Sequence, residues 1–332
     1  MNLYKCVFIC ALYLLSGAHV GVIAQQASWL PEVKNANKPI RLLECTYNEA
    51  ELKQSKEIST TTDWEVRTEQ TTVNGGKTYT FTFTAKQDMK DAGVAVAFDQ
   101  YGWTSDNYVM IPSSVYNGNR QRIVNRAYAT GLDNTDYRRK DLALTSNPIP
   151  QLSPEYGAGS RLEVNISNTA TPAITILDRA KQKGIFLLTD QGIDWNNQVL
   201  DHALIVEETP DRSVASFIIS APGVRERKPE FIGFSKSPDR GVQVKKGDQI
   251  VIRVTEVTFP CKDVPELLGR FMKDRKSHAG GEAPRNLMPM SEVLTRMVKN
   301  IDDRYYIGDQ WQYYCPENAN WMSYGWIGGL MN

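Results

Sequence analysis

The feature that most constrains the fold of this chain is a long succession of short strand-like runs. From about residue 42 to residue 258, stretches rich in β-branched and aromatic residues alternate with Gly, Asn, Asp and Pro. In the clearest run, 77–85, aromatic residues at 79, 81 and 83 alternate with threonines. One face of this run is apolar and the other hydroxylated, which predicts a half-buried β-strand.

A tight turn precedes this run and predicts a hairpin. Asn74-Gly75-Gly76 supplies residues that tolerate the positive φ of a short turn, so 65–73 is expected to pair with 77–85. Further strands are predicted at 93–98, 108–111, 161–166, 173–177, 184–189, 202–207, 214–220 and 250–257. Many short strands without amphipathic helices between them indicate a mostly β chain built on a large antiparallel β-sandwich.

The pattern becomes helical after Pro260. Asp263 and Glu266 have the spacing of a capping box, and apolar residues then recur at helical spacing at 267, 268, 271 and 272. After a polar, glycine-rich break at 277–285, Ser291 is expected to cap a second helix. Its apolar side would consist of Val293, Leu294, Met297, Val298 and Ile301. The sequence therefore predicts a two-helix linker after the sandwich.

The first residues have the pattern of an export signal. One lysine, Lys5, precedes an apolar stretch at 6–15, and small residues follow up to Ala24. This is the order of a cleavable signal peptide with cleavage near Ala24, which predicts a secreted or periplasmic protein. No later segment approaches the roughly 20 apolar residues of a membrane-spanning helix, so no membrane span is expected.

Cysteine content and charge exclude several classes of protein. After removal of the signal only Cys45, Cys261 and Cys315 remain, which is too few for a disulfide framework. One bridge with a leftover thiol and three free thiols are both open. Lys and Arg together number 38, as do Asp and Glu, and no basic cluster occurs. Nucleic acid is therefore not an expected partner, and the sequence leaves the oligomeric state open.

No residue pattern indicates a cofactor or a metal. His202 and His278 lie far apart and lack a ligand-spaced partner, so a zinc site is not expected. The glycines near the C-terminus lack the lysine of a phosphate loop and are interpreted as allowing close backbone approach. Carboxylate pairs such as Glu207-Glu208 are interpreted as surface groups or ordinary salt bridges.

Two stretches resemble a known family. Residues 108–120, Tyr-Val-Met-Ile-Pro-Ser-Ser-Val-Tyr-Asn-Gly-Asn-Arg, resemble the signature MPAAVYNGNR of a Bacteroidetes group of six-hairpin glycosidase-like proteins. Residues 320–331, Asn-Trp-Met-Ser-Tyr-Gly-Trp-Ile-Gly-Gly-Leu-Met, are similar to the loop that opens the helical toroid of that group. The resemblance implies a large N-terminal β-sandwich (supersandwich), followed by an (α/α)6 toroid that carries the glycosidase site.

Under this resemblance the chain divides into four parts. These are a signal peptide at 1–24, a β-sandwich domain at 25–260, a helical linker at 261–304 and the truncated start of an (α/α)6 catalytic domain at 305–332. The apolar, glycine-rich finish is unusual for a domain end and is interpreted as a truncation. The paired catalytic carboxylates of such glycosidases are expected further on, so this chain is predicted to lack them.

Aromatic and amide side chains supply the candidate sugar-binding residues. Sugar rings present apolar C–H faces flanked by hydroxyls, so their sites combine flat aromatic rings with directional hydrogen-bonding groups. The first candidate set surrounds a predicted loop and comprises Tyr101, Trp103, Asn107, Tyr116, Asn117, Asn119 and Arg120. The second set comprises Trp311, Trp321, Tyr324 and Trp326. The alternatives are core packing and turn formation for the first set, and packing between linker and barrel for the second.

Three functions are compatible with these observations. The leading hypothesis is the N-terminal portion of a secreted or periplasmic glycoside hydrolase that acts on complex polysaccharide, with the sandwich as scaffold and contributor to a sugar subsite. The second is a non-catalytic carbohydrate-binding module, and the third is a structural domain of a truncated gene product. Oligo- or polysaccharide is the expected partner under the first two hypotheses.

Overall fold

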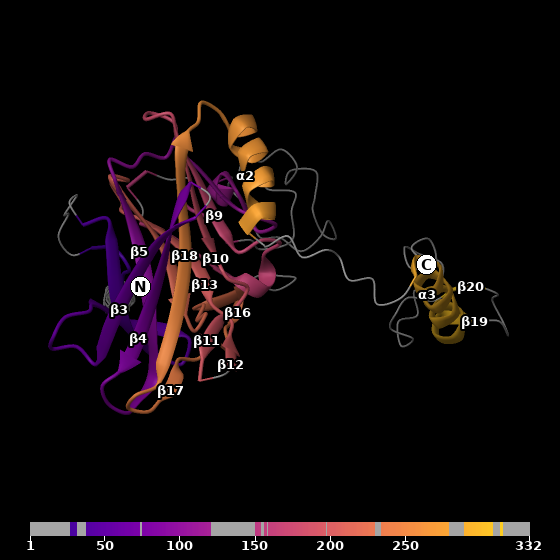
Figure 1. The fold of residues 1–332 in the computed structure, drawn as a ribbon, viewed down its shortest axis with the longest axis horizontal. Coiled ribbons are helices and arrows are strands. Elements are labelled where there is room, and N and C mark those ends of the chain that lie inside the picture. Colours follow the sequence, from indigo (N-terminus) through magenta and orange to yellow (C-terminus); the bar gives the residue numbers. More distant parts are fainter. Residues whose placement is uncertain are drawn as a thin grey trace, which may run out of the picture. The chain divides into compact units, whose positions relative to one another are not determined.

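The structure is a computed structural model. It describes residues 27–31, 38–73, 75–120, 150–153, 156–157, 159–196, 198–229, 234–278, 289–307 and 313–314. The chain divides into two compact units, Met1–His278 and Ala279–Asn332. The first unit holds two large antiparallel sheets and helix α2, and the second holds helix α3 (Figure 1). The prediction of a mostly β, antiparallel chain is confirmed.

The first sheet, sheet A, has seven strands among the described residues. Its main order is β2-β1-β5-β14-β13-β8, and β17 pairs with one end of β5. All of these pairs are antiparallel. The strands are β1 (Ile40–Asn48), β2 (Glu51–Glu57), β5 (Met89–Tyr101), β8 (Ser160–Asn165), β13 (Ala203–Glu208), β14 (Val214–Ala221) and β17 (Val242–Val244).

The second sheet, sheet B, has nine strands in the same described part of the chain. The long strand β18 is central, with the β3-β4 hairpin on one side and β11 and β10 on the other. The strands are β3 (Trp64–Val73), β4 (Gly76–Ala85), β6 (Tyr108–Ile111), β7 (Val115–Tyr116), β9 (Ala173–Asp178), β10 (Lys183–Thr189), β11 (Ile193–Trp195), β12 (Gln198–Leu200) and β18 (Gln249–Pro260).

Shorter elements complete the first unit. A small ribbon is formed by β15 (Arg227–Pro229) and β16 (Phe234–Lys236). Two 3-10 turns, η1 (Asn117–Asn119) and η3 (Ile166–Asn168), follow β7 and β8. The predicted strand positions agree with β3 to β6, β8 to β10, β13, β14 and β18 to within a few residues, whereas β1, β2 and the short strands were not placed by the sequence.

The main core lies between the two sheets. On β4, Tyr79, Phe81 and Phe83 are buried while the alternating threonines are only half-buried, as the period-2 pattern predicts. They meet inner-face residues of sheet A, including Phe98 and Phe217. Because successive side chains of a strand point to opposite faces, one apolar face per strand suffices to fill the space between two sheets.

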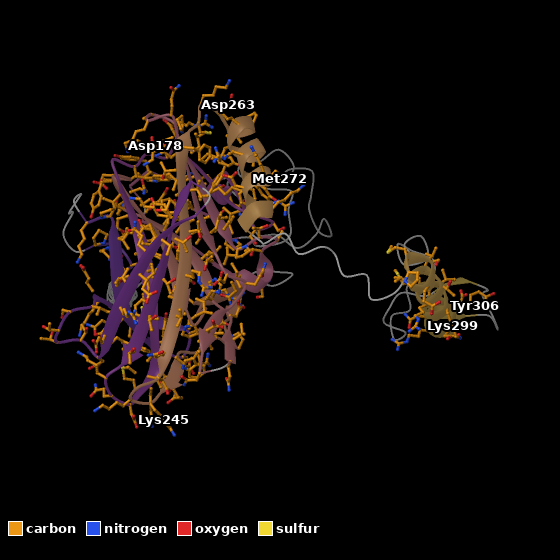
Figure 2. The ribbon with its side chains drawn as sticks, in the orientation of Figure 1. Asp178, Lys245, Asp263, Met272, Lys299 and Tyr306 are labelled. Atoms are coloured by element: carbon orange, nitrogen blue, oxygen red, sulfur yellow. The ribbon has the colours of Figure 1, made fainter. Side chains whose placement is uncertain are left out.

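Helix α2 (Val264–His278) covers the outer face of sheet B. Leu267 and Phe271 are buried there, and the Phe271 ring meets the Phe186 ring at a centroid distance of 5.6 Å. Asp263 stands at the start of the helix, whereas Met272 points away from the sheet (Figure 2). This helix therefore belongs to the sandwich unit, which extends to His278, beyond the boundary at 260 that the sequence suggested.

The predicted start of α2 is borne out by its hydrogen bonds. The Glu266 backbone N–H donates to Asp263 Oδ1 at 2.9 Å, as in a capping box. The Glu266 carboxylate accepts from the backbone N–H of Lys262 at 3.0 Å, one residue earlier than in the standard arrangement. The first interaction satisfies an N–H group that a helix start leaves without a partner, and the second fastens the residue before the N-cap to the first turn.

The second unit contains α3 (Met290–Tyr305) and a ribbon of β19 (Tyr306–Ile307) and β20 (Tyr313–Tyr314). The helix begins at Met290 with Pro289 as its N-cap, so Ser291 lies inside the first turn and the prediction of a Ser291 cap is wrong. Proline suits a helix start because its φ is fixed near the helical value and it lacks an N–H. Along the predicted apolar side, Leu294, Met297 and Val298 are exposed.

Candidate functional site

Trp103, from the first candidate set, is part of the core. Its side chain is 4% exposed, and its ring meets the Phe217 ring edge-on at a centroid distance of 5.4 Å. Its indole Nε1–H donates to Glu208 Oε1 at 2.7 Å. Since both the ring and its polar tip are engaged inside the sandwich, Trp103 presents no free face to a sugar.

The amides of this set hold turns together. Asn107 is buried, and its Oδ1 accepts from the backbone N–H of Arg179 at 3.1 Å. The Asn119 side chain donates to the carbonyls of Ser114 and Pro150, both at 2.8 Å, and accepts from the Tyr116 N–H at 2.9 Å. These contacts match the turn alternative that the sequence left open.

Two residues of the set remain exposed. Tyr116 is 57% exposed, and its hydroxyl accepts from the backbone N–H of Ser113 at 3.3 Å. Asn117 is exposed with a φ of 53°, and the next residue, Gly118, has a φ of 66°. A side chain on Gly118 would come within 2.8 Å of the buried Leu152, so this turn requires glycine for two reasons.

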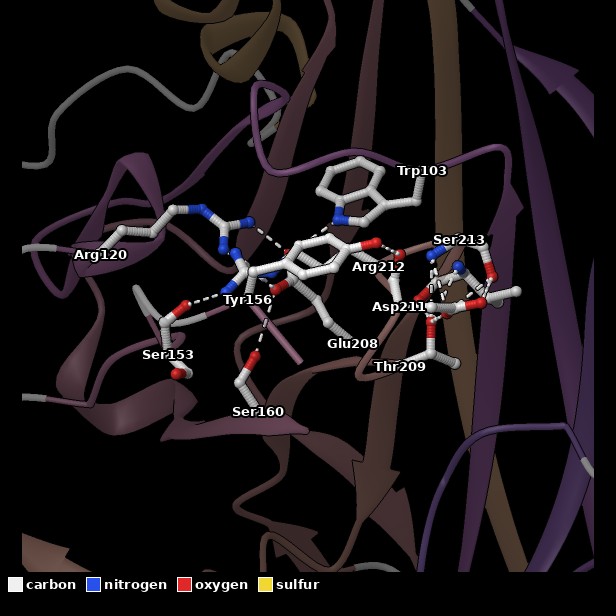
Figure 3. A network of polar contacts seen from close by, with 11 residues as sticks. Trp103, Arg120, Ser153, Tyr156, Ser160, Glu208, Thr209, Asp211, Arg212 and Ser213 are labelled. Atoms are coloured by element: carbon white, nitrogen blue, oxygen red, sulfur yellow. Dashed lines mark hydrogen bonds and ion pairs between the residues drawn. The ribbon is translucent and has the colours of Figure 1, made fainter. Parts of the chain in front are cut away.

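Arg120 belongs to a buried polar network around Glu208 (Figure 3). The Glu208 carboxylate is almost fully buried and accepts from Trp103, from Ser160 Oγ at 3.1 Å, and from both terminal nitrogens of Arg120. Arg212 Nη1 lies 3.9 Å from Glu208 Oε2. We name these five residues the Glu208 network.

The Glu208 network closes one end of the space between the sheets. Glu208 follows the inner-face residue Val206 on β13, and Ser160 lies opposite it on β8. A buried charge is costly unless it is paired and hydrogen-bonded, and here both carboxylate oxygens have several donors. Because both oxygens of Glu208 are already paired with donors inside the sandwich, we interpret the network as a structural element.

A second polar row lies on the outer face of sheet A. Arg41 forms a two-pronged ion pair with Asp99, and Ser216 donates to Asp99 Oδ1 at 2.5 Å. Further along the same face, Arg161 contacts both Glu207 and Glu163. Thus Glu207 and Glu208 form salt bridges, as the sequence suggested, but both are buried and they point to opposite faces.

The segment 27–31 lies over this row. The Trp29 backbone N–H and the Ser28 hydroxyl donate to the two oxygens of Glu207, both at 2.9 Å. Arg41 Nη2 donates to the Trp29 carbonyl at 2.7 Å, and the Trp29 ring is buried in an apolar cluster with Leu43 and Ile218. The segment therefore follows the outer face of sheet A through both polar and apolar contacts.

Glu163 and His202 in this unit have pKa values shifted by burial. Burial raises the pKa of Glu163 from 4.5 to about 7, against the opposing effects of Arg161 and of the hydrogen bond from the Glu226 N–H. Burial lowers the pKa of His202 from 6.5 to about 4. Both groups are therefore mainly neutral near pH 6, since burial disfavours whichever form is charged.

A cleft of about 630 Å³ lies at one edge of the sandwich and is here called the edge cleft. Strand β2 ends sheet A and β3 ends sheet B on this side, and the connection between them crosses from one sheet to the other. The lining residues come from β1 to β4 and this connection: Lys38, Ile40, Leu42, Glu57, Ile58, Ser59, Thr60, Trp64, Glu65, Val66, Thr68, Tyr79, Phe81 and Lys86.

The edge cleft combines an apolar floor with a polar rim. Half-buried aliphatic side chains, among them Ile40, Leu42 and Val66, form the floor, and the buried rings of Trp64 and Tyr79 lie among the lining residues. Lys38 and Glu57 form an exposed ion pair on the rim. A second cleft, of about 610 Å³, shares Lys38, Glu57 and Ser59 with the first and is also lined by Tyr101 from the first candidate set. The rim ion pair thus lies between two adjacent hollows.

The remaining sequence predictions concern the tail and metal binding. Trp311, Trp321, Tyr324 and Trp326 lie outside the described residues. Within the described ranges, no group of three or more His, Cys, Asp or Glu residues could hold a metal ion, and Cys45 and Cys261 are both buried free thiols. No helix in that part of the chain has the length and hydropathy needed to cross a membrane.

Sequence reasoning did not find the edge cleft. Its lining residues Trp64, Tyr79 and Phe81 appear in the sequence only as ordinary core positions of a hairpin. The available signal was that this hairpin is rich in aromatic residues on one face, which fits a sugar surface as well as a core. Deciding between them requires knowing that β2 and β3 end different sheets on the same side.

Comparisons with known proteins give little further guidance. No protein-family model matches the chain, and no curated protein matches it. The Slr1438 protein from Synechocystis sp. PCC 6803 is similar over 69% of this chain and 65% of its own, with 8% identity and a TM-score of 0.31. The α-N-acetylgalactosaminidase NagBb from Bifidobacterium bifidum is similar over 80% of this chain and 37% of its own, with 9% identity and a TM-score of 0.29.

This chain therefore matches less than two thirds of the length of either structure. At these TM-scores the likenesses do not decide between functions.

Proposed function

We propose that this chain is the β-sandwich portion of an exported glycoside hydrolase and that the sandwich binds oligo- or polysaccharide in the edge cleft. The observation that carries the proposal is the make-up of that cleft, in which a largely aliphatic floor lies beneath a rim of hydroxyls and charged groups. A sugar ring needs both, because its C–H faces pack on apolar surface while its hydroxyls require donors and acceptors.

Hydrogen-bonding groups are available around the rim. Ser59, Thr60 and Thr68 are exposed, and each offers a hydroxyl that can donate and accept. The Lys38–Glu57 pair adds a cationic donor and an anionic acceptor at the point where the two clefts meet. Because their charges balance, the rim favours a neutral or zwitterionic sugar over a strongly acidic one.

The catalytic step is assigned elsewhere. The resemblance of 108–120 and 320–331 to six-hairpin glycosidase-like proteins implies that an (α/α)6 toroid carries the acid and the base or nucleophile. In the sandwich, Glu208 and Glu207 are both engaged in buried ion pairs. The export signal at 1–24 supports action on polysaccharide in the periplasm or outside the cell.

The test begins with a glycan array probed with the protein after signal removal, followed by titration of any glycan that binds. Val66→Phe puts an aromatic ring in place of a smaller aliphatic side chain on the half-buried cleft floor, and we expect it to weaken binding about 10-fold or more by occupying the ligand's space. The matched control is Thr258→Phe, which adds a ring at an exposed strand position that does not line the cleft. Because Thr and Val side chains have nearly the same shape, both substitutions add about the same volume.

The outcomes separate the alternatives. Binding that Val66→Phe weakens and Thr258→Phe preserves supports the proposal, whereas binding unaffected by Val66→Phe would move the site away from the edge cleft. If the correctly folded protein bound no glycan, the sugar-binding proposal would fail and the structural-domain hypothesis would be favoured. Reading the gene beyond the codon for Asn332 separates part of a hydrolase from the second candidate, a non-catalytic binding module: a continuing frame that encodes amphipathic helices and a Glu or Asp pair would support the hydrolase.

A further inference from the structure

The outer edge of sheet B is formed by an unusually regular strand. Strand β3 pairs with β4 over all ten of its residues without a register shift, and no other strand in the described residues pairs with it. The other edges are shorter: β2 and β8 have seven and six residues, β12 three and β7 two. The partner of β2 carries a register shift.

An edge strand of this kind offers backbone N–H and C=O groups to another strand. Proteins commonly block such edges with a bulge, a proline or a very short strand. None of these features occurs in β3, whose sequence is Trp-Glu-Val-Arg-Thr-Glu-Gln-Thr-Thr-Val and whose ladder to β4 is continuous. Within β3 itself, the feature left that could block this edge is its charged side chains.

The charges of β3 alternate in sign on one face. Trp64 is buried toward the interior, so Glu65, Arg67 and Glu69 lie together on the opposite, outer face. Arg67 and Glu69 form an ion pair along the strand at 2.8 Å, with side chains 79% and 57% exposed. A second copy of the strand, running antiparallel, presents the same alternation in reverse order.

We propose that two copies of this chain associate through their β3 edges, with Thr68 of one copy opposite Thr68 of the other. This two-fold arrangement places Arg67 of each copy opposite Glu69 of the other and pairs 64–72 of both strands. Each copy then makes the same contacts, as a two-fold interface requires. The two nine-stranded sheets become one continuous sheet.

Neighbouring registers fit less well. Centring the pair on Arg67 would set Glu65 opposite Glu69, and like charges directly opposite are destabilising. Centring it on Val66 does set Glu65 opposite Arg67, but it pairs only 64–68 of each strand and sets Glu69 opposite Asp63. Of these registers, the one centred on Thr68 is the one that both sets opposite charges against each other and pairs nearly the full length of the strand. This inference does not depend on the proposed sugar binding.

The experiment measures dimer dissociation by sedimentation velocity on the protein after signal removal, at several concentrations and low salt. Arg67→Glu sets two pairs of glutamates opposite each other, so we expect the dissociation constant to rise about 10-fold or more. Glu69→Arg is expected to act equally, because it sets two pairs of arginines opposite each other. The double variant Arg67→Glu/Glu69→Arg restores opposite charges and is expected to recover dimerisation.

The control is Arg253→Glu on β18 of the same sheet, which reverses an exposed charge that pairs with Asp190. It is expected to leave the dissociation constant unchanged. All three substituted positions are exposed, and far-ultraviolet circular dichroism verifies that each of the four variants is folded. A wild-type protein that stays monomeric throughout, a dimer indifferent to both single reversals, or a double variant that fails to recover would each overturn the inference.

Discussion

Glu208 and Glu163 are both carboxylates of sheet A, yet the protein treats them differently. Glu208, on the inner face, accepts from Trp103, Ser160 and Arg120 and has Arg212 nearby. Glu163, on the outer face, accepts from the Glu226 backbone N–H and must share Arg161 with Glu207. Glu163 has fewer partners than Glu208, and burial raises the pKa of Glu163 to about 7. Glu163 thus lacks the several side-chain donors that pair with Glu208, and its own pKa rises because burial disfavours its charged form.

The largest expected effect comes from removing the carboxylate with many partners. Glu208→Ala leaves the side chains of Arg120 and Arg212 buried without their shared counter-charge, and Trp103 loses its acceptor. We expect a loss of about 3–5 kcal/mol in the free energy of unfolding, measured by urea denaturation at pH 7. A loss below about 1 kcal/mol would contradict the claim that this network closes the sandwich.

A smaller loss is expected when the shared cation is removed. Arg161→Met keeps the length of the side chain but leaves Glu163 and Glu207 without their arginine. We expect a loss of about 2–3 kcal/mol at pH 8 and a smaller one at pH 5, because protonation of Glu163 then relieves the repulsion. Equal losses at both pH values would show that the arginine acts by packing alone.

The third prediction tests the protonation of Glu163 directly. Its folded pKa of about 7 lies above its ordinary 4.5, so between these pH values the folded state binds more protons than the unfolded chain. The contribution of this group to stability therefore decreases as pH rises through that window. Glu163→Gln removes the effect, and we expect the variant to gain about 1–2 kcal/mol on the wild type between pH 5 and pH 8.

His202 has the opposite pH dependence. Glu163→Gln must therefore be compared with the wild type at each pH, so that the effect of His202 is the same in both proteins. The folded pKa of His202, about 4, lies below its ordinary 6.5, so its contribution to stability increases as pH rises between these values. Both proteins contain His202, and its effect cancels when the two unfolding curves are subtracted. A difference that stays constant with pH would sink the assignment for Glu163.

The smallest loss in the free energy of unfolding is expected at an exposed ion pair. This pair shows how little a carboxylate contributes when it is not buried. Asp190 pairs with Arg253, and both side chains are more than 40% exposed. Asp190→Ala should change the free energy of unfolding by about 0–1 kcal/mol, measured under the same conditions as Glu208→Ala. If the two losses were similar, burial and partner number would not be the deciding factors.

The sequence predicted much of the sandwich because strands with one buried face carry a local pattern. The aromatic and threonine alternation of 77–85 and its hairpin with 65–73 were placed correctly, since both depend on neighbouring residues. Strands β1 and β2 were not placed by the sequence. In β2, Lys and Glu side chains interrupt the apolar pattern, and its pairing with β1 contains a register shift.

The candidate site was only partly predictable. Tyr101 lines a cleft, whereas Trp103, Asn107, Asn119 and Arg120 have partners inside the sandwich. These partners are distant in sequence: Glu208 and Trp103, for example, are 105 residues apart. A residue type shows what a side chain can do, but its availability depends on which distant residues fold against it.

The sequence by itself determined the strand content, the antiparallel class and the capping of the first linker helix, since each follows from the intrinsic preferences of residues near one another. The tertiary structure alone decided that this helix covers sheet B, that Glu207 and Glu208 are buried on opposite faces, and that two sheet edges diverge to leave a cleft. Burial and charge pairing come from contacts between distant segments, and local patterns do not specify which segments meet.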